Sequence, residues 1–229
     1  MRKLVLAAVV IGMAVTAMRS DQAETKAADR VQAAADVLNE IQGAPDQGMP
    51  EDVLASAECV AVVPTMLNGG FIIGARFGRG VSSCRTPKGW SAPAFFTVEG
   101  GSFGFQIGGQ AIDLVMLVMN DDGMRKLLSS KFKLGADASV AAGPVGRHAA
   151  ADTDWTMRAQ ILSYSRARGV FAGVALDGAV VKQDKDSTRE FYGHMVTPKA
   201  SLGGAVTPPA AAYPFLETLA KWAKAAAKK

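Results

Sequence analysis

Apolar residues change from helical to strand-like spacing about a quarter of the way along the chain. Residues 25–42 repeat apolar side chains at intervals of three and four, from Val31 to Ile41, which predicts a helix with one apolar face. Gly43 ends this pattern, because glycine is common just after a helix. Pro50 then begins a second, short helix that extends to about residue 57, since proline is tolerated at a first helical position.

Short runs rich in β-branched and aromatic residues follow, separated by Gly, Pro, Asn or Lys. They are, in order, CVAVVP, GGFIIGARFG, GVSSCR, APAFFTVEG, SFGFQIGG and AIDLVMLVM. This rhythm is typical of a meander of antiparallel strands. Helices are predicted at 121–131 and 186–192, and further strands at 136–142, 155–165, 170–176 and 178–183. The predicted class is therefore α+β, with a curved antiparallel sheet or small barrel-like meander flanked by a few helices.

The first residues have a different pattern. Arg2 and Lys3 precede an uncharged apolar run over residues 4–17, which ends in small residues, as in a secretory signal peptide. An uncleaved membrane anchor is the alternative, but the run is shorter than the ~20 residues that a membrane-spanning helix needs. We expect a signal peptide at 1–17, with cleavage there or a few residues later. The protein is then periplasmic or secreted, and associates peripherally with a membrane.

The last residues return to helical spacing. A proline- and alanine-rich segment at 197–214 predicts a linker. Residues 215–229 place an apolar stripe beside lysines, and a basic amphipathic helix of this kind lies on anionic membranes. The alternative is that the helix packs back on the domain. The candidate lipid contacts in it are Lys221, Trp222, Lys224 and Lys228.

Charge and cysteine content narrow the choice of partners. The chain of 229 residues carries a formal charge of +4, and the excess lies in its two ends, which leaves the body near neutral. A nucleic-acid-binding domain would carry a basic face, so no nucleic acid is expected. Cys59 and Cys84 lie 25 positions apart. They form either one structural disulfide, worth roughly 3 kcal/mol, or two buried thiols.

The glycine-rich stretch GGSFGFQIGG at 100–109 formally contains the G-x-S-x-G of a hydrolase nucleophile elbow around Ser102. That elbow needs a strand, a sharp turn and a helix, whereas this stretch predicts strand, glycine turn and strand. A serine hydrolase is therefore a remote alternative. The two histidines and two cysteines are dispersed singly, without metal-ligand spacing. We expect no catalytic residue, no metal and no cofactor, and glycines that let strands bend and pack closely.

Several ordered blocks resemble the SYLF domain family, over roughly residues 30–193. They are Trp90-Ser91-Ala92-Pro93, Gln106-Ile107-Gly108, Asp113, Gly143-Pro144-x-Gly146-Arg147, Tyr164-Ser165-Arg166 and Phe171-Ala172-Gly173. SYLF domains are the lipid-binding domains of yeast actin-patch proteins and of many bacterial exported proteins. The resemblance implies a non-enzymatic module at 25–196 that binds anionic phospholipid or a membrane surface.

The resemblance also names candidate residues and partners. Arg147, Arg166 and Arg168 are candidates to bind lipid phosphate through planar, bidentate donors. Their alternative role is to pair with Asp152, Asp154 or Asp113 and hold loops. Actin is not expected as a partner, because export separates the chain from actin. A structural envelope protein that binds a protein partner through the same fold is the second hypothesis.

Overall fold

Two long, antiparallel strands form the framework of the fold. β1 (Cys59–Thr86) and β3 (Ala94–Val118) pair along most of their length, and the two-residue strand β2 (Gly89–Trp90), which follows β1 in the sequence, pairs with the last residues of β1. The computed structural model describes residues 26–43, 48–146, 159–167, 170–174 and 176–226, with the backbone alone at 70–73, 102–109 and 224–226. We call the β1–β3 pair the ribbon.

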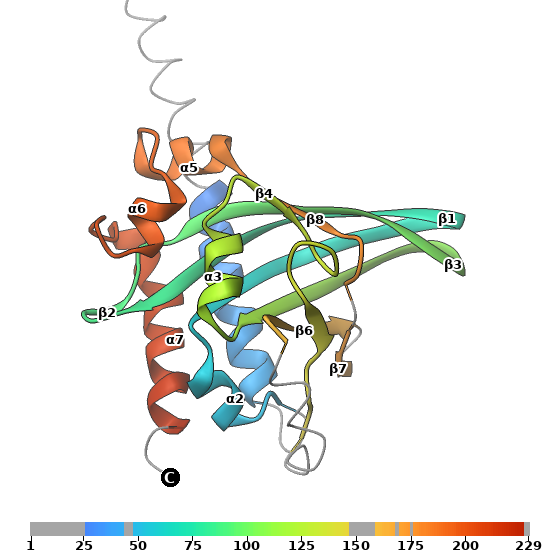
Figure 1. Cartoon of the computed structure of the whole chain (residues 1–229), viewed down its shortest axis with the longest axis horizontal. Coiled ribbons are helices and arrows are strands. Elements are labelled where there is room, and N and C mark those ends of the chain that lie inside the picture. Colours follow the sequence, from blue (N-terminus) through green and yellow to red (C-terminus); the bar gives the residue numbers. More distant parts are fainter. Residues whose placement is uncertain (1–25, 44–47, 147–158, 168–169, 175, 227–229) are drawn as a thin grey trace, which may run out of the picture.

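The ribbon bends back near its middle, so that it has two limbs and projects beyond the helices (Figure 1). The pairing of its strands shifts register between Gly70 and Ile72. Glycines let the two limbs come close together: a Cβ atom on Gly80 would lie only 2.7 Å from the carbonyl oxygen of Val62. The sequence predicted separate short strands here. The strands are continuous because the chain bends at these glycines and the pairing resumes after the register shift.

Shorter strands extend the sheet on the other edge of β3. β8 (Val180–Gln183) pairs with residues 96–99 and β6 (Ile161–Ala167) with residues 113–118. β4 (Lys131–Lys133) pairs with β8, and β7 (Val170–Gly173) with β6, all antiparallel. β5 (Val140–Ala142) runs parallel to β6. The predicted α+β class with a curved sheet is confirmed, and β5 makes the sheet mixed rather than wholly antiparallel.

Helices cover the sheet on both faces, and each face has its own apolar core. The N-terminal helix (residues 26–43), α2 (Glu51–Ser56) and α7 (Tyr213–Ala226) share one core with alternate residues of β1, such as Val60 and Val62. The residues between them, such as Ala61 and Val63, face the second core near α3 (Asp121–Leu127). Because both faces are buried, these strand segments are apolar at every position.

The C-terminal third packs on the body. α5 (Lys185–Tyr192) is followed by α6 (Pro198–Leu202) and by a 3-10 helix at Ala210–Ala212 that leads into α7. The segment 197–214, expected to be an extended linker, is thus partly helical. The Thr197 side chain accepts a hydrogen bond from the backbone N–H of Ala200, and Leu202 is buried. A proline at the first helical position started a helix here instead of keeping the chain extended.

Candidate functional site

Arg166, one of the three candidate arginines, lies in ion pairs within the fold. Its Nε and one terminal nitrogen donate to Asp113 Oδ2 at 3.0 and 2.6 Å, and its other terminal nitrogen meets the carboxylate of Glu40. Asp113 in turn accepts a hydrogen bond from the backbone N–H of Thr65 at 3.0 Å. Thr65 has a φ of +61° and lies in the register shift between Val63 and Met66. Of the two roles expected for Arg166, binding lipid phosphate or pairing with an aspartate, the structure has the pairing with Asp113.

We expect Arg166→Gln to lower stability and to leave lipid binding unchanged. The substitution removes the partner of a partly buried carboxylate, and an unsatisfied buried group costs about 1–3 kcal/mol. Urea unfolding would measure the loss, and vesicle co-sedimentation would measure binding. A variant as stable as the wild type that no longer sediments with anionic vesicles would instead make Arg166 a lipid ligand.

Tyr164, two residues before Arg166, is a core residue. Its ring stacks on Phe171 with centroids 5.2 Å apart, and the side chain is fully buried. The hydroxyl has no hydrogen-bond partner in the described part of the chain. Burial raises the pKa of the Tyr164 hydroxyl, so this group stays neutral. The Tyr-Ser-Arg block of the sequence is therefore structural at both of these positions.

Of the other candidate lipid contacts, only Lys221 and Trp222 have side chains that the structure describes. Arg147 and Arg168 lie outside the described residues, as does Lys228, and the side chain of Lys224 is not described. Lys221 is exposed on α7, with its ammonium 4.6 Å from the centre of the Trp222 ring. The Trp222 indole nitrogen donates to Asn39 Oδ1 at 3.1 Å, which joins α7 to the N-terminal helix. In this structure α7 thus packs on the domain, which was the alternative to lying on a membrane.

Cys59 and Cys84 form a disulfide with a sulfur–sulfur distance of 2.02 Å. Both are buried, one at the start of β1 and the other near its end. The bond therefore joins the bases of the two limbs of the ribbon. The backbone N–H of Arg85 donates to the carbonyl of Glu58 beside it, at 2.8 Å.

Ser102 lies within β3, where its backbone is opposite Gly74. The strand continues for many residues after it, so the strand–turn–helix geometry of a nucleophile elbow is absent at this position. His194 is exposed just after α5, and His148 lies outside the described residues. No helix in the described part of the chain is both long enough and apolar enough to cross a bilayer.

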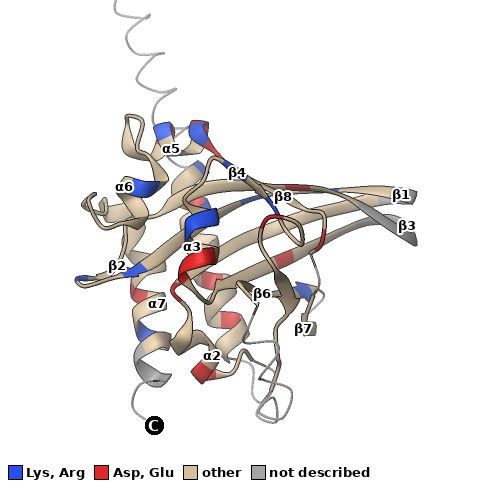
Figure 2. Cartoon of the chain, in the orientation of Figure 1, with Lys and Arg blue, Asp and Glu red and all other residues tan. Residues whose placement is uncertain are grey.

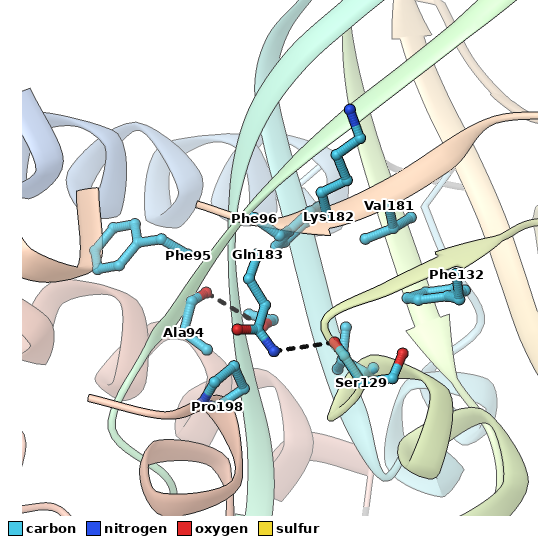
Figure 3. Close-up of a pocket in the computed structure, with 11 residues that line it drawn as sticks. Ala94, Phe95, Phe96, Ser129, Phe132, Val181, Lys182, Gln183 and Pro198 are labelled. Carbon is cyan, nitrogen blue, oxygen red and sulfur yellow. Dashed lines mark hydrogen bonds between the residues drawn. The ribbon is translucent and has the colours of Figure 1, made fainter. Parts of the chain in front are cut away.

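A small hollow lies where β3 and β8 meet the segment that follows α3 (Figure 3). Phe96, Phe132 and Val181 contribute to its lining, and the Gln183 amide donates to the Ser129 carbonyl at 3.0 Å. Its free volume of about 10 Å³ is that of a single water molecule. The hollow is therefore too small to hold an organic ligand.

The ribbon is the more promising surface. It carries exposed apolar side chains: Leu67, beyond the strands that flank β3, is 57% exposed, and Phe77, opposite Glu99 at the border of the sheet body, is 43% exposed. No charged residue occurs over residues 66–75 or 100–112. Figure 2 shows charged residues on the helices and on β8, while the far described part of the ribbon is largely without them. Sequence reasoning missed this surface, because the same apolar runs were read as strands of the sheet body.

Comparison with known proteins places the chain in a family. Residues 99–222 match the family model Ysc84, described as "Las17-binding protein actin regulator". The chain belongs to the Ysc84 (SYLF) family. This SYLF chain is 35% identical over 205 residues to LAS seventeen-binding protein 3 of Saccharomyces cerevisiae, covering 88% of the chain and 44% of the relative. It is 32% identical over 177 residues to SH3 domain-containing YSC84-like protein 1 of Bos taurus, covering 76% of the chain and 52% of the relative.

These relatives correct the partner prediction. The expectation that actin is not a partner is wrong for the family, because its model is described as an actin regulator and the yeast relative is named for binding Las17. Actin had been excluded only because the N-terminal segment predicts export, and not because of any residue of the domain itself. This SYLF chain spans about half the length of the curated relatives that it matches. The family model and the yeast relative are both described as Las17-binding, which is a regulatory and not an enzymatic description.

Proposed function

We propose that this SYLF chain is an exported, non-enzymatic module that binds anionic phospholipid at a membrane surface, with the segment 1–17 directing export. The observation that carries the proposal is the projecting ribbon, with exposed Leu67 and Phe77 next to uncharged stretches. The sequence of these stretches includes Phe71, Ile72 and Phe103. Apolar surface that is exposed on a soluble domain is costly in water and marks contacts with membranes or proteins.

The ribbon suits a membrane contact because its strands already pair with each other. Backbone polar groups that enter the apolar part of a bilayer need internal partners. β1 and β3 pair with each other as far as Gly70 opposite Gly108 and again from Ile72 opposite Gly104, so part of the backbone hydrogen-bonding groups of this end are already bonded internally. A shallow insertion of this end would therefore bury apolar side chains without leaving every backbone group unpaired.

Co-sedimentation with vesicles tests the proposal. The full chain is expected to sediment with vesicles of phosphatidylcholine that contain about one third phosphatidylglycerol, and not with phosphatidylcholine alone. The double variant Leu67→Gln and Phe77→Gln should weaken this binding at least about tenfold, because each side chain would lose the burial of its apolar area. Its stability should not change, since both residues are exposed.

The matched control is Val170→Gln with Met195→Gln, which removes exposed apolar side chains elsewhere. This control pair should bind as the wild type does. If the wild type stays in the supernatant with anionic vesicles, the lipid-binding function is refuted. If both pairs weaken binding equally, the ribbon is not the contact.

A second candidate function is binding of a protein partner linked to actin regulation. The names of the relatives support it, since the yeast relative is named for binding Las17. Purified Las17 and actin filaments would each be tested for co-sedimentation or co-elution with this chain. Retention of the chain with either protein, and its absence from vesicles, would favour this function over lipid binding.

A further inference from the structure

Four residues from four adjacent strands form one row across the sheet. Lys131 of β4 is opposite Lys182 of β8, Lys182 is opposite Thr97 of β3, and Thr97 is opposite Arg79 of β1. Directly paired residues of antiparallel strands project from the same face of a sheet. Three basic residues that are far apart in the sequence therefore share one face. We call Lys131, Lys182 and Arg79, with the neighbouring Lys133, the basic row.

The basic row lies on the solvent side of the sheet. Its neighbours along each strand, Phe132, Val181 and Val98, are buried in the core on the opposite face. Lys131 and Lys133 are exposed, and the side chains of Lys182 and Arg79 are 41% and 52% exposed. Figure 3 shows the Lys182 side chain pointing away from the hollow that Gln183 enters.

Acidic groups offset this charge only in part. Lys182 pairs with Glu99, and the hydrogen bond from Lys182 holds the pKa of the Glu99 carboxyl below its ordinary value. Arg79 Nε lies 3.9 Å from Asp184, which also faces Arg30. Asp137 accepts a hydrogen bond from the backbone N–H of Lys133 at 2.7 Å. Lys131 and Lys133 make no ion pair with any residue that the structure describes, so the face keeps an excess of positive charge.

Edge protection explains only part of this arrangement. Lysines on an edge strand prevent edge-to-edge aggregation, and β4 pairs only with β8 among the described strands. Lys182, however, lies on β8, which is inside the sheet between β4 and β3. Two lysines directly opposite one another destabilise a sheet, so Lys131 opposite Lys182 costs stability, and Glu99, which pairs with Lys182 and also feels the charge of Lys131, offsets this cost only in part. An anionic partner on the solvent side would remove that cost.

We propose that the basic row binds the phosphate groups of anionic lipids when the ribbon contacts the membrane. The inference rests on the proposed function and adds the residues that hold the headgroups. At about 4.8 Å between neighbouring strands, the row spans about 14 Å from β4 to β1, which is wider than a single phosphate. It therefore suits a surface of several anionic groups. Phe77 lies two residues before Arg79 on the same face, which joins the basic row to the apolar ribbon.

The test uses the full chain and the double variant Lys131→Gln and Lys133→Gln. Both side chains are exposed and unpaired in the described structure, so the fold and its thermal midpoint should not change. Each lysine near an anionic surface strengthens binding. Binding to vesicles with about one third phosphatidylglycerol should weaken about thirtyfold at low ionic strength, or about 2 kcal/mol at 1.4 kcal/mol per factor of ten.

The control is Lys88→Gln with Lys199→Gln, which makes the same change in net charge at two exposed lysines away from the basic row. This pair should weaken binding by less than about threefold. Equal losses in the two double variants would show that net charge alone acts, and would overturn the proposal. Wild-type affinity of the Lys131 and Lys133 variant would overturn it too. If the wild type itself does not bind anionic vesicles, the proposed function fails and this inference fails with it.

Discussion

Replacing Phe215 with alanine is expected to lower the free energy of unfolding by about 4 kcal/mol. Phe215 is the first apolar residue of the stripe in α7, and its side chain is fully buried in the core shared with the N-terminal helix. The substitution removes an aromatic ring and leaves a cavity. For a chain of this size, the midpoint of thermal unfolding should fall by about 12 °C.

Urea unfolding and a thermal melt would measure this loss, with Glu217→Ala as the control on an exposed position of the same helix. Glu217→Ala should change stability by less than about 0.5 kcal/mol. If Phe215→Ala leaves stability unchanged and abolishes vesicle binding, α7 is a membrane anchor and not part of the core.

Reducing the protein is expected to lower its free energy of unfolding by about 3 kcal/mol. The Cys59–Cys84 disulfide closes a loop with a sequence separation of 25, and the loss follows from the greater freedom of the reduced, unfolded chain. Thiol titration of denatured, unreduced protein should find no free thiol. Urea unfolding with and without reductant would measure the change in stability.

The double variant Cys59→Ser and Cys84→Ser is the control for this experiment. It should have the stability of the reduced protein and should not respond to reductant. Two free thiols in the denatured, unreduced protein would show instead that the disulfide does not form.

The local spacing of apolar residues predicted the helices and strands of this fold better than it predicted how the strands continue and pair. The N-terminal helix followed from apolar spacing around Val31 and Leu38, both of which are buried. The continuity of β1 through Gly69 and Gly70 did not follow, because glycine in a strand pattern is also a signal for a turn. The prolines suggested a linker where the chain has α6. Proline content did not decide between the two, because proline fits both an extended segment and a first helical position.

The basic row could not be predicted from the sequence, because its residues come together only through the pairing register of separate strands. Arg79, Lys131 and Lys182 are about fifty positions apart in the sequence and share a face through three separate strand pairings. Arg166 stood out in a motif, yet its partner Glu40 lies on the N-terminal helix, far away in the chain. The sequence blocks thus identified the family. The pattern of charge on the surface could be seen only once the strand pairing of the sheet was known.

The long pairing of β1 with β3 also has a consequence for the order of folding. Ser82 pairs with Ala94, close by in the sequence, and each later pair joins residues farther apart, until Cys59 meets Val118. Every step adds only a short stretch to a loop that is already closed, so its entropic cost is small. Nucleation is therefore expected at the β1–β2 turn around Gly89, followed by propagation along the ribbon. The disulfide would then form late, because Cys59 reaches Cys84 only after the last pairs are in place.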